Sequence, residues 1–212
     1  MNIATELAQS LLKIKAVKLQ VSDPFTWASG MRSPIYCDNR ITLAYPAVRD
    51  MIKHAFAYQI KEFEKVDAIV GVATAGIAHG ALLADQLDLP FAYVRSKAKA
   101  HGRQNLIEGE LKEGQSVVVI EDLISTGGSS LQAVEALRAH NINVIAVGSI
   151  FDYGFNLSRE NFGKAKCPYF SLSNYQTLTE EAEKIEYITS QEKSTLSDWN
   201  KDPKSWYSKN FS

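Results

Sequence analysis

Apolar residues follow two spacings that alternate along the chain. Short continuous runs typical of buried strands lie at 67–72, 91–94, 117–121 and 142–151. Runs with an apolar residue every three or four positions, which predict helices, lie at 46–63, 76–88, 129–140 and 156–165. Because strand and helix alternate several times, we expect an α/β fold with a central, mostly parallel sheet flanked by helices and joined by right-handed crossovers.

The two ends of the chain add further elements. Helical spacing predicts a helix over 3–16, and residues 25–40 are typical of two short strands around a turn at Gly30. Residues 169–172 suit an edge strand, and two helices are expected after it. A capping box formed by Thr189 and Glu192 starts the second of these helices, which should end near Pro203.

Three polar or glycine-rich loops follow predicted strands, at 71–76, 95–110 and 121–130. In a parallel sheet, ligands bind beyond the carboxyl ends of the strands. The topology should therefore bring these loops together around one ligand.

The loop 121–130 combines two carboxylates, Glu121 and Asp122, with a turn rich in small residues. Its glycines and hydroxyls are Ser125, Thr126, Gly127, Gly128, Ser129 and Ser130. Such a turn at a helix N-terminus can hold phosphate through backbone N–H groups. Carboxylates repel phosphate, so the acidic pair should face hydroxyl groups or a metal-bound part of the same ligand. Phosphoribosyl pyrophosphate has a phosphate, vicinal hydroxyls and a metal-chelating group, and it fits this loop.

A simpler interpretation of the same loop is structural. Ser129 and Gln132 have the spacing of a capping box, so the hydroxyls could only begin a helix. The loop lacks both the Gly-Lys-Ser/Thr of a Walker A motif and the Gly-x-Gly-x-x-Gly of a dinucleotide site. The adjoining acidic pair favours the phosphoribosyl interpretation.

The other two loops have a weaker signal. Residues 95–103 carry four cations and His101, which is typical of either a solvated basic loop or a lid over an anion. The loop 71–76 has small residues that let an anion approach the backbone, although a tight turn would look the same. His54, His79 and His140 are expected to be surface or half-buried helix residues.

Composition narrows the class of protein. A chain of 212 residues with 45% hydrophobic content suits one α/β domain. The net charge of −1 gives no general reason to expect nucleic acid or membrane binding. Cys37 and Cys167 form no Cys-x-x-Cys motif, there is no apolar run of membrane-spanning length, and the N-terminus lacks a signal peptide pattern. We expect a cytoplasmic protein.

The segment 117–130 resembles the phosphoribosyl motif of the type I phosphoribosyltransferases. Two further motifs are similar to those of the orotate phosphoribosyltransferase family: Ser-Gly-x-x-Ser-Pro-Ile-Tyr at 29–36, and Arg-Ser-Lys followed by Lys-x-His-Gly at 95–102. The resemblance implies the type I fold over residues 1–212. A small N-terminal hood of about 1–40 would join the C-terminal helices, and the core would cover about 46–172.

The resemblance also implies an activity. Phosphoribose would pass from phosphoribosyl pyrophosphate to N1 of orotate, giving orotidine 5′-monophosphate and pyrophosphate in de novo pyrimidine (UMP) biosynthesis. Mg²⁺ would be required and held mainly by the substrate pyrophosphate, with no dedicated protein ligand. A homodimer is implied, in which the lid of one subunit closes on the neighbouring site. No nucleic acid and no membrane partner are implied.

The roles carried over from the family fall on named positions. Catalysis would rest on Asp122, Lys99 and His101. The phosphoribosyl pyrophosphate site would contain Arg95, Lys99, His101, Glu121, Asp122, Leu123, Ile124, Ser125, Thr126, Gly127, Gly128, Ser129, Thr74 and Ala75. The orotate site would contain Ser125, Tyr36, Cys37 and Arg32.

This chain departs from some family members. It has Ala28, Ala75 and Ser96 where those members carry lysine, and no arginine occurs in 151–154, where they bind the orotate carboxylate. Arg32 is the candidate for that carboxylate here.

Two other functions fit the sequence less well. A purine or uracil phosphoribosyltransferase would need a different hood. A regulator that senses phosphoribosyl pyrophosphate would need a basic nucleic-acid-binding face.

Overall fold

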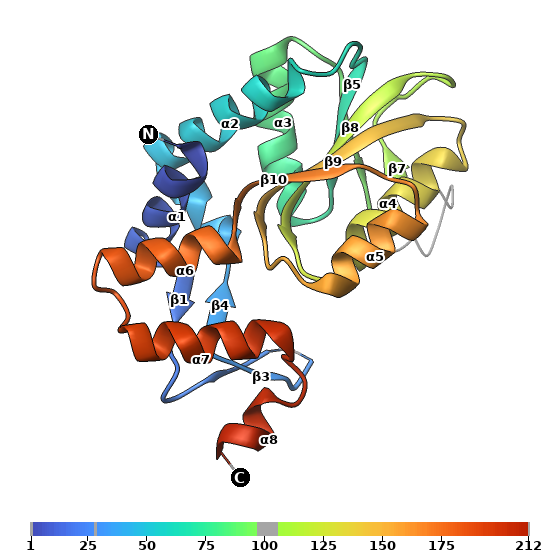
Figure 1. Ribbon diagram of the computed structural model, residues 1–212. Coiled ribbons are helices and arrows are strands. Elements are labelled where there is room, and N and C mark those ends of the chain that lie inside the picture. The colour runs from blue at the N-terminus through green and yellow to red at the C-terminus, as the bar shows by residue number, and fades with distance from the viewer. Residues whose placement is uncertain (1, 28, 97–105, 212) are drawn as a thin grey trace.

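A six-stranded sheet forms the centre of the molecule in the computed structural model, which describes residues 2–27, 29–96 and 106–211 (Figure 1). The strand order is β10-β9-β8-β5-β6-β7, and every neighbouring pair is parallel except β6 and β7. The strands are β5 (Ala68–Val72), β6 (Phe91–Val94), β7 (Ile107–Glu108), β8 (Ser116–Ile124), β9 (Asn143–Asp152) and β10 (Tyr169–Asn174). The predicted mostly parallel α/β sheet is confirmed.

Helices cover both faces of this sheet, as alternating side chains of its strands require. Ile69, Val118 and Ile120 belong to one hydrophobic cluster, which includes α2 (Pro46–Ile60) and α3 (Ala75–Leu87). Val70, Val117 and Val119 belong to the second cluster, with α4 (Gly128–Arg138) and α5 (Asn156–Lys164). Figure 1 shows α2 and α3 on one side of the sheet and α4 and α5 on the other.

The N-terminal and C-terminal segments pack together beside the sheet (Figure 1). The N-terminal elements are α1 (Ile3–Lys13), β1 (Val17–Leu19), β2 (Phe25–Thr26), β3 (Arg32–Ser33), β4 (Ile35–Cys37) and the 3₁₀ helix η1 (Asn39–Ala44). Strand β1 pairs with β4 and β2 pairs with β3, both antiparallel. The C-terminal elements are α6 (Tyr175–Lys184), α7 (Ser190–Lys201) and α8 (Trp206–Phe211).

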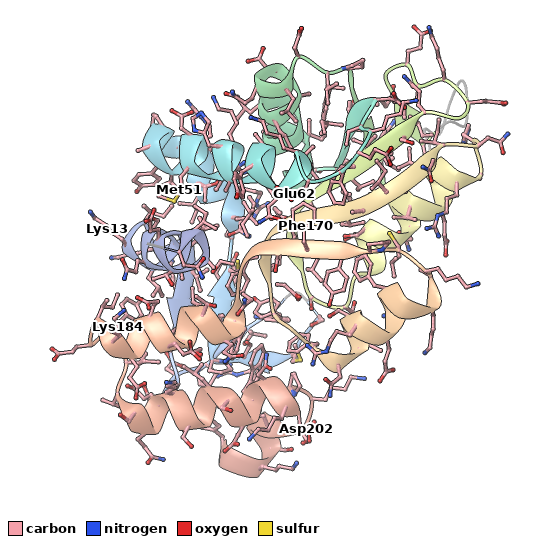
Figure 2. The ribbon with its side chains drawn as sticks, turned by 45° about the horizontal axis from the view of Figure 1, so that its top comes forward. Lys13, Met51, Glu62, Phe170, Lys184 and Asp202 are labelled. Carbon is pink, nitrogen blue, oxygen red and sulfur yellow. The ribbon has the colours of Figure 1, made fainter. Side chains whose placement is uncertain are left out.

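Aromatic side chains fill the contacts between these layers. Phe170 of β10 lies between the sheet and helix α2, where its ring is 6.3 Å from that of Phe56 (Figure 2). Trp199 of α7 and Trp206 of α8 are buried, at 0% and 2% exposure. These two C-terminal tryptophans therefore belong to the hydrophobic core of the chain.

Most predicted elements are confirmed within a few residues, including the capping box at Thr189 and Glu192. The structure differs in several places. Besides the two strands predicted around Gly30, the N-terminal segment has a further antiparallel pair, β1 and β4. Strand β8 continues to Ile124, so the acidic pair lies inside the strand rather than after it. The polar stretch after β6 contains the short strand β7. Three helices rather than two follow β10, because Pro203 ends α7 and α8 then begins at Trp206.

The described helices include none that is both long and apolar enough to cross a membrane. The division of the chain into a hood and a core stays a prediction.

Candidate active site

The two carboxylates near the end of β8 lie in different surroundings. Glu121 is 5% exposed, and its Oε2 accepts hydrogen bonds from the hydroxyls of Ser129, at 2.9 Å, and Ser130, at 3.3 Å. Its Oε1 accepts from the backbone N–H of Asp122 at 3.1 Å. Asp122 itself is half-buried. The strand thus holds Glu121 against the first turn of α4 and leaves Asp122 less buried.

Burial disfavours the ionised form of both carboxylates. Burial, followed by the nearby charge of Asp122, raises the pKa of Glu121 to about 8. Burial also raises the pKa of Asp122. Hydroxyl donors or cations brought by a ligand would offset this penalty, so the pair suits a sugar with free hydroxyls.

The turn after β8 leads directly into helix α4. Gly127 is the N-cap, with φ of 80°, and no side chain caps the helix. A Cβ at Gly127 would lie 2.6 Å from Cε2 of Phe162, so glycine is required for both conformation and space. The N–H groups at the start of α4 lack a side-chain cap and can bind an anion.

The structural interpretation of Ser129 as a helix cap is not what the structure shows. Its hydroxyl donates to Glu121, and Gly127 occupies the capping position. Ser125 is half-buried and Thr126 is exposed. The side chain of Asn161 in α5 donates to the carbonyl of Thr126 at 2.9 Å and fixes the turn. Sequence reasoning missed Asn161, because 35 residues separate it from its partner.

The remaining members of the predicted phosphoribosyl site lie around this turn. Leu123 and Ile124 complete β8, and Gly128 begins α4. Thr74 and Ala75 lie at the start of α3, after β5, and the peptide bond between Ala73 and Thr74 is cis.

A close approach of backbones joins this first loop to β8. A Cβ at Gly76 would lie 2.3 Å from the carbonyl oxygen of Ile120. Glycine at this position brings helix α3 against the strand that carries the acidic pair. The loops after β5 and β8 are therefore neighbours, as the topology predicts.

The hood contributes Tyr36 and Cys37 from β4. The Tyr36 side chain is 37% exposed and its ring lies 5.7 Å from that of Phe25. Burial, followed by the charge of Asp122, raises the pKa of the Cys37 thiol well above its ordinary value, so the thiol is neutral. The Asn39 side chain, two residues after Cys37, donates to the main-chain carbonyl of Asp122, so this segment lies beside the acidic pair.

Arg32 lies against the C-terminal helix. Its Nη1 donates to the Thr26 hydroxyl at 2.9 Å, and its guanidinium is 4.9 Å from the centre of the Tyr207 ring. This cation–π contact holds the side chain toward α8. Arg95 follows β6 and forms an ion pair with Glu108 of β7 at 3.4 Å. Lys99, His101 and Ala28 lie outside the described residues.

A cavity of about 560 Å³ adjoins the turn. Ser125 and Thr126 line it on one side, and Met31 of the hood lies on another. Arg159 of α5 and Asn200 of α7 also line it, and both were missed because they lie far from any motif. The cavity gives the strand–turn–helix a space large enough for a small-molecule ligand.

His79 is buried rather than at the surface or half-buried, so that expectation is wrong for this residue. It is 3% exposed, and its Nε2 lies 3.1 Å from the Thr42 hydroxyl. Burial, followed by the charge of Arg49, lowers its pKa to about 4. Its helix packs against η1, a contact that periodicity cannot reveal. His54 and His140 are exposed, as expected.

Comparison with known proteins agrees with this geometry. The model of the phosphoribosyl transferase domain matches residues 42–175, a range that contains β5, β8, α4 and the loops between them. The fold and the site therefore define a phosphoribosyltransferase.

Curated relatives narrow the class. The orotate phosphoribosyltransferase of Bacteroides thetaiotaomicron is 53% identical over 206 residues, which cover 97% of each chain. That of Listeria innocua is 51% identical over 207 residues, covering 97% of this chain and 99% of the relative. The chain belongs to the orotate phosphoribosyltransferase family.

A solved structure supports the same fold. The orotate phosphoribosyltransferase of Aeropyrum pernix is similar with a TM-score of 0.75 and 29% sequence identity. The match covers 86% of this chain and 99% of that chain.

Proposed function

We propose that the chain transfers phosphoribose from phosphoribosyl pyrophosphate to N1 of orotate, giving orotidine 5′-monophosphate and pyrophosphate in de novo pyrimidine (UMP) biosynthesis. The observation that carries this proposal is the end of β8, where two carboxylates precede an uncapped helix N-terminus. Such a site suits a ligand with both sugar hydroxyls and a phosphate, and membership of the family favours orotate as the acceptor.

The acidic pair acts on the ribose of the substrate. Positive charge develops at the anomeric carbon when a glycosidic bond breaks, so a nearby carboxylate lowers the barrier. Asp122, on the ligand side of β8, accepts hydrogen bonds from the ribose hydroxyls and stabilises that charge. Glu121 joins it once a bound ligand offsets the cost of its burial. No covalent intermediate on the protein is needed, because orotate N1 attacks the anomeric carbon directly. The protein accelerates this step by holding the two substrates in the reactive geometry.

The anionic parts of the substrate lie on either side of the sugar. Backbone N–H groups of Ser125, Thr126 and Ser129, with the hydroxyls of Ser125 and Thr126, hold the 5′-phosphate, and Gly127 and Gly128 allow close approach. Thr74, Ala75 and Arg95 bind the pyrophosphate. Lys99 and His101 close over it and stabilise the charge that grows as it leaves.

Magnesium fits this arrangement as a companion of the substrate. Mg²⁺ prefers hard oxygen ligands and commonly binds substrate phosphates. Within the described part of the chain, no group of three or more His, Cys, Asp or Glu side chains is placed to hold a metal ion. We assign Mg²⁺ mainly to oxygens of the substrate pyrophosphate, where it would neutralise charge on the leaving group.

The acceptor lies between the hood and the turn. Ser125, Tyr36 and Cys37 contact the orotate ring in this proposal. Arg32 is the partner of the orotate carboxylate, and it must then exchange its contacts with Thr26 and Tyr207 for that carboxylate. An Arg32→Ala variant should raise KM for orotate while leaving KM for phosphoribosyl pyrophosphate unchanged.

A direct assay tests the function. The purified protein is mixed with Mg²⁺, phosphoribosyl pyrophosphate and orotate, and the loss of orotate ultraviolet absorbance is followed. We expect turnover that requires all three components, whereas uracil or adenine in place of orotate should give none. Turnover with one of those bases and not with orotate would overturn the proposal.

The assembly is a separate part of the proposal: a cytoplasmic homodimer in which each lid closes on the neighbouring site. Lys99→Ala and Asp122→Asn subunits are mixed under conditions that exchange partners. About half of the dimers are then mixed, and each has one site free of both defects, so activity should return to roughly a quarter of wild type. If each lid serves its own subunit, no activity returns despite exchange confirmed by mass spectrometry.

A further inference from the structure

Asn39 connects the hood to the strand that carries the acidic pair. It is the first residue of η1, directly after β4 and the Asp38 cap, and its side chain is completely buried. Its Nδ2 donates to the main-chain carbonyl of Asp122 at 2.7 Å. A side chain from the hood thus bonds the backbone of the proposed catalytic residue.

The register of the sheet explains why this bond matters. Strand β5 pairs with β8 only as far as Gly71 and Ile120. Beyond that point β8 continues to Ile124 with β9 as its neighbouring strand on the other side. The backbone around Asp122 therefore lacks a strand partner on the β5 side, and the Asn39 amide takes that place. A buried carbonyl left without a donor would be costly.

Asn39 is itself held at several points. The Cys37 thiol donates to its Oδ1 at 3.5 Å, and the Thr42 hydroxyl donates to its main-chain carbonyl at 2.5 Å. Because the hydroxyl proton of Thr42 is used there, the neighbouring His79 Nε2 is the donor toward Thr42, and the imidazole is neutral. The chain of bonds runs from α3 through η1 to both Cys37 and Asp122.

We infer that Asn39 is a positioning residue for the proposed reaction, holding the backbone of Asp122 in register with the hood residues Tyr36 and Cys37. This inference rests on the proposed function, because Asp122 must act on the sugar for its position to matter. A shift of about 1 Å in a catalytic group can lower a rate by about 100-fold. The Asn39 amide donates to strand β8, which is proposed to bind the sugar. It also accepts from Cys37, which is proposed to contact the orotate ring.

Kinetics of variants can separate positioning from packing. Asn39→Ala should lower kcat by roughly 10- to 100-fold per folded molecule, with a much smaller change in KM for phosphoribosyl pyrophosphate, because the phosphate turn is untouched. Asn143→Ala is the matched control, since the side chain of Asn143 donates to the Ser116 hydroxyl at the opposite end of β8, at 3.0 Å. This control should keep wild-type kcat.

A double-mutant cycle provides a readout that packing alone would not move. If Asn39 acts through Asp122, Asn39→Ala should cost little further rate in a protein that already carries Asp122→Asn. Full additivity of the two losses would overturn the inference. Thr42→Val keeps the shape of the side chain and removes the hydroxyl that holds Asn39. Like Asn39→Ala, it should lower kcat, here by several-fold. It supplies the measurement if Asn39→Ala does not fold.

The possible failures are distinguishable. A wild-type protein without orotate turnover would overturn the proposed function and this inference together. An active wild type with an equally active, folded Asn39→Ala variant would overturn the inference alone. Folding is checked for every variant by circular dichroism at the assay temperature.

Discussion

Two regions of the molecule are built from opposite kinds of side chain. One is an aromatic cluster to which the C-terminal helices α6 and α7 contribute, and the other is the acidic end of β8. The aromatic cluster consists of Trp27, Tyr153, Phe155, Tyr175 and Trp199, whose rings meet at 5.4–5.9 Å along most of its contacts. Two of its polar tips donate to backbone carbonyls: the Tyr175 hydroxyl to that of Leu196 at 2.8 Å and the Trp27 indole to that of Ile35 at 3.0 Å. At the acidic end, two carboxylates are instead kept where burial raises their pKa.

The difference separates stability from chemistry. Burial of large rings removes apolar area from water and adds favourable ring contacts, so the aromatic cluster should contribute strongly to the free energy of unfolding. Burial of the two carboxylates instead lowers the free energy of unfolding when no ligand is bound. Local rules are commonly broken at functional sites in this way. Substitutions in the two regions should therefore affect different measurements.

The largest effect is expected from Trp199→Ala. Trp199 is fully buried and contacts four other rings of the cluster, so its truncation should lower the free energy of unfolding by about 3–5 kcal/mol. Urea unfolding measures this loss. Activity per folded molecule should change far less than stability. A loss of activity with unchanged stability would place this cluster in the chemistry.

Trp199→Phe is the matched control for this variant. The indole N–H has no hydrogen-bond partner among the described residues. Phenylalanine keeps a ring in the cluster and removes that unpaired donor, so its cost should be clearly smaller than that of alanine.

The next effect concerns pH and the buried His79. Its folded-state pKa of about 4 lies below the ordinary 6.5, so the stability it contributes is complete above pH 6.5. As the pH falls from 6.5 toward 4, the unfolded chain binds a proton that the folded chain does not. Stability on the order of 3 kcal/mol is then lost by pH 4.

His79→Gln removes this titration and keeps an amide donor toward Thr42. The free energy of unfolding of wild type and variant is measured by urea unfolding from pH 7.5 to 4. As the pH falls, any advantage of the wild type should become smaller or reverse in the variant's favour. Contributions of Glu121 and Asp122 cancel in that difference. A difference that does not vary with pH would mean that folding leaves the pKa of His79 at its ordinary value.

Asp122→Asn tests the acidic end itself. Removal of a charge that stabilises the transition state should lower kcat by on the order of 100-fold, equivalent to about 2.7 kcal/mol. Burial raises the pKa of Asp122, so neutralising it should leave the melting temperature unchanged or higher at pH 8. Asp50→Asn, at an exposed position in α2, is the control. A folded Asp122→Asn protein with wild-type kcat would contradict the role of the pair.

The contrast also explains what the sequence could predict. The strands and the turn of the active site were predictable because their signals are local: a run of β-branched residues, then carboxylates, glycines and hydroxyls in 14 consecutive positions, 117–130. The bond from Asn39 to Asp122 spans 83 residues, and no local pattern marks it. The burial of His79 likewise depends on η1 packing against α3. Such contacts exist only after the chain has folded.

The smallest effect is expected at the start of α7, where a local signal was predicted and confirmed. The Thr189 hydroxyl accepts from the N–H of Glu192 at 3.2 Å, and the Glu192 carboxylate accepts from the N–H of Thr189 at 2.8 Å. Thr189→Ala should cost about 1 kcal/mol, because the N–H of Glu192 loses its side-chain acceptor. The melting temperature should fall by about 2–4 °C for a chain of this size.

Thr195→Ala, in the middle of the same helix, controls for the loss of a hydroxyl. Among the described residues, its side chain bonds only the carbonyl of Gln191 in the preceding turn, and alanine has the higher helix propensity, so stability should be unchanged or higher. Neither variant should alter kcat, because the capping box bonds within the start of α7, ten positions before Trp199. A change in kcat for Thr189→Ala would show that the C-terminal helices tune the chemistry and that the two regions are not independent.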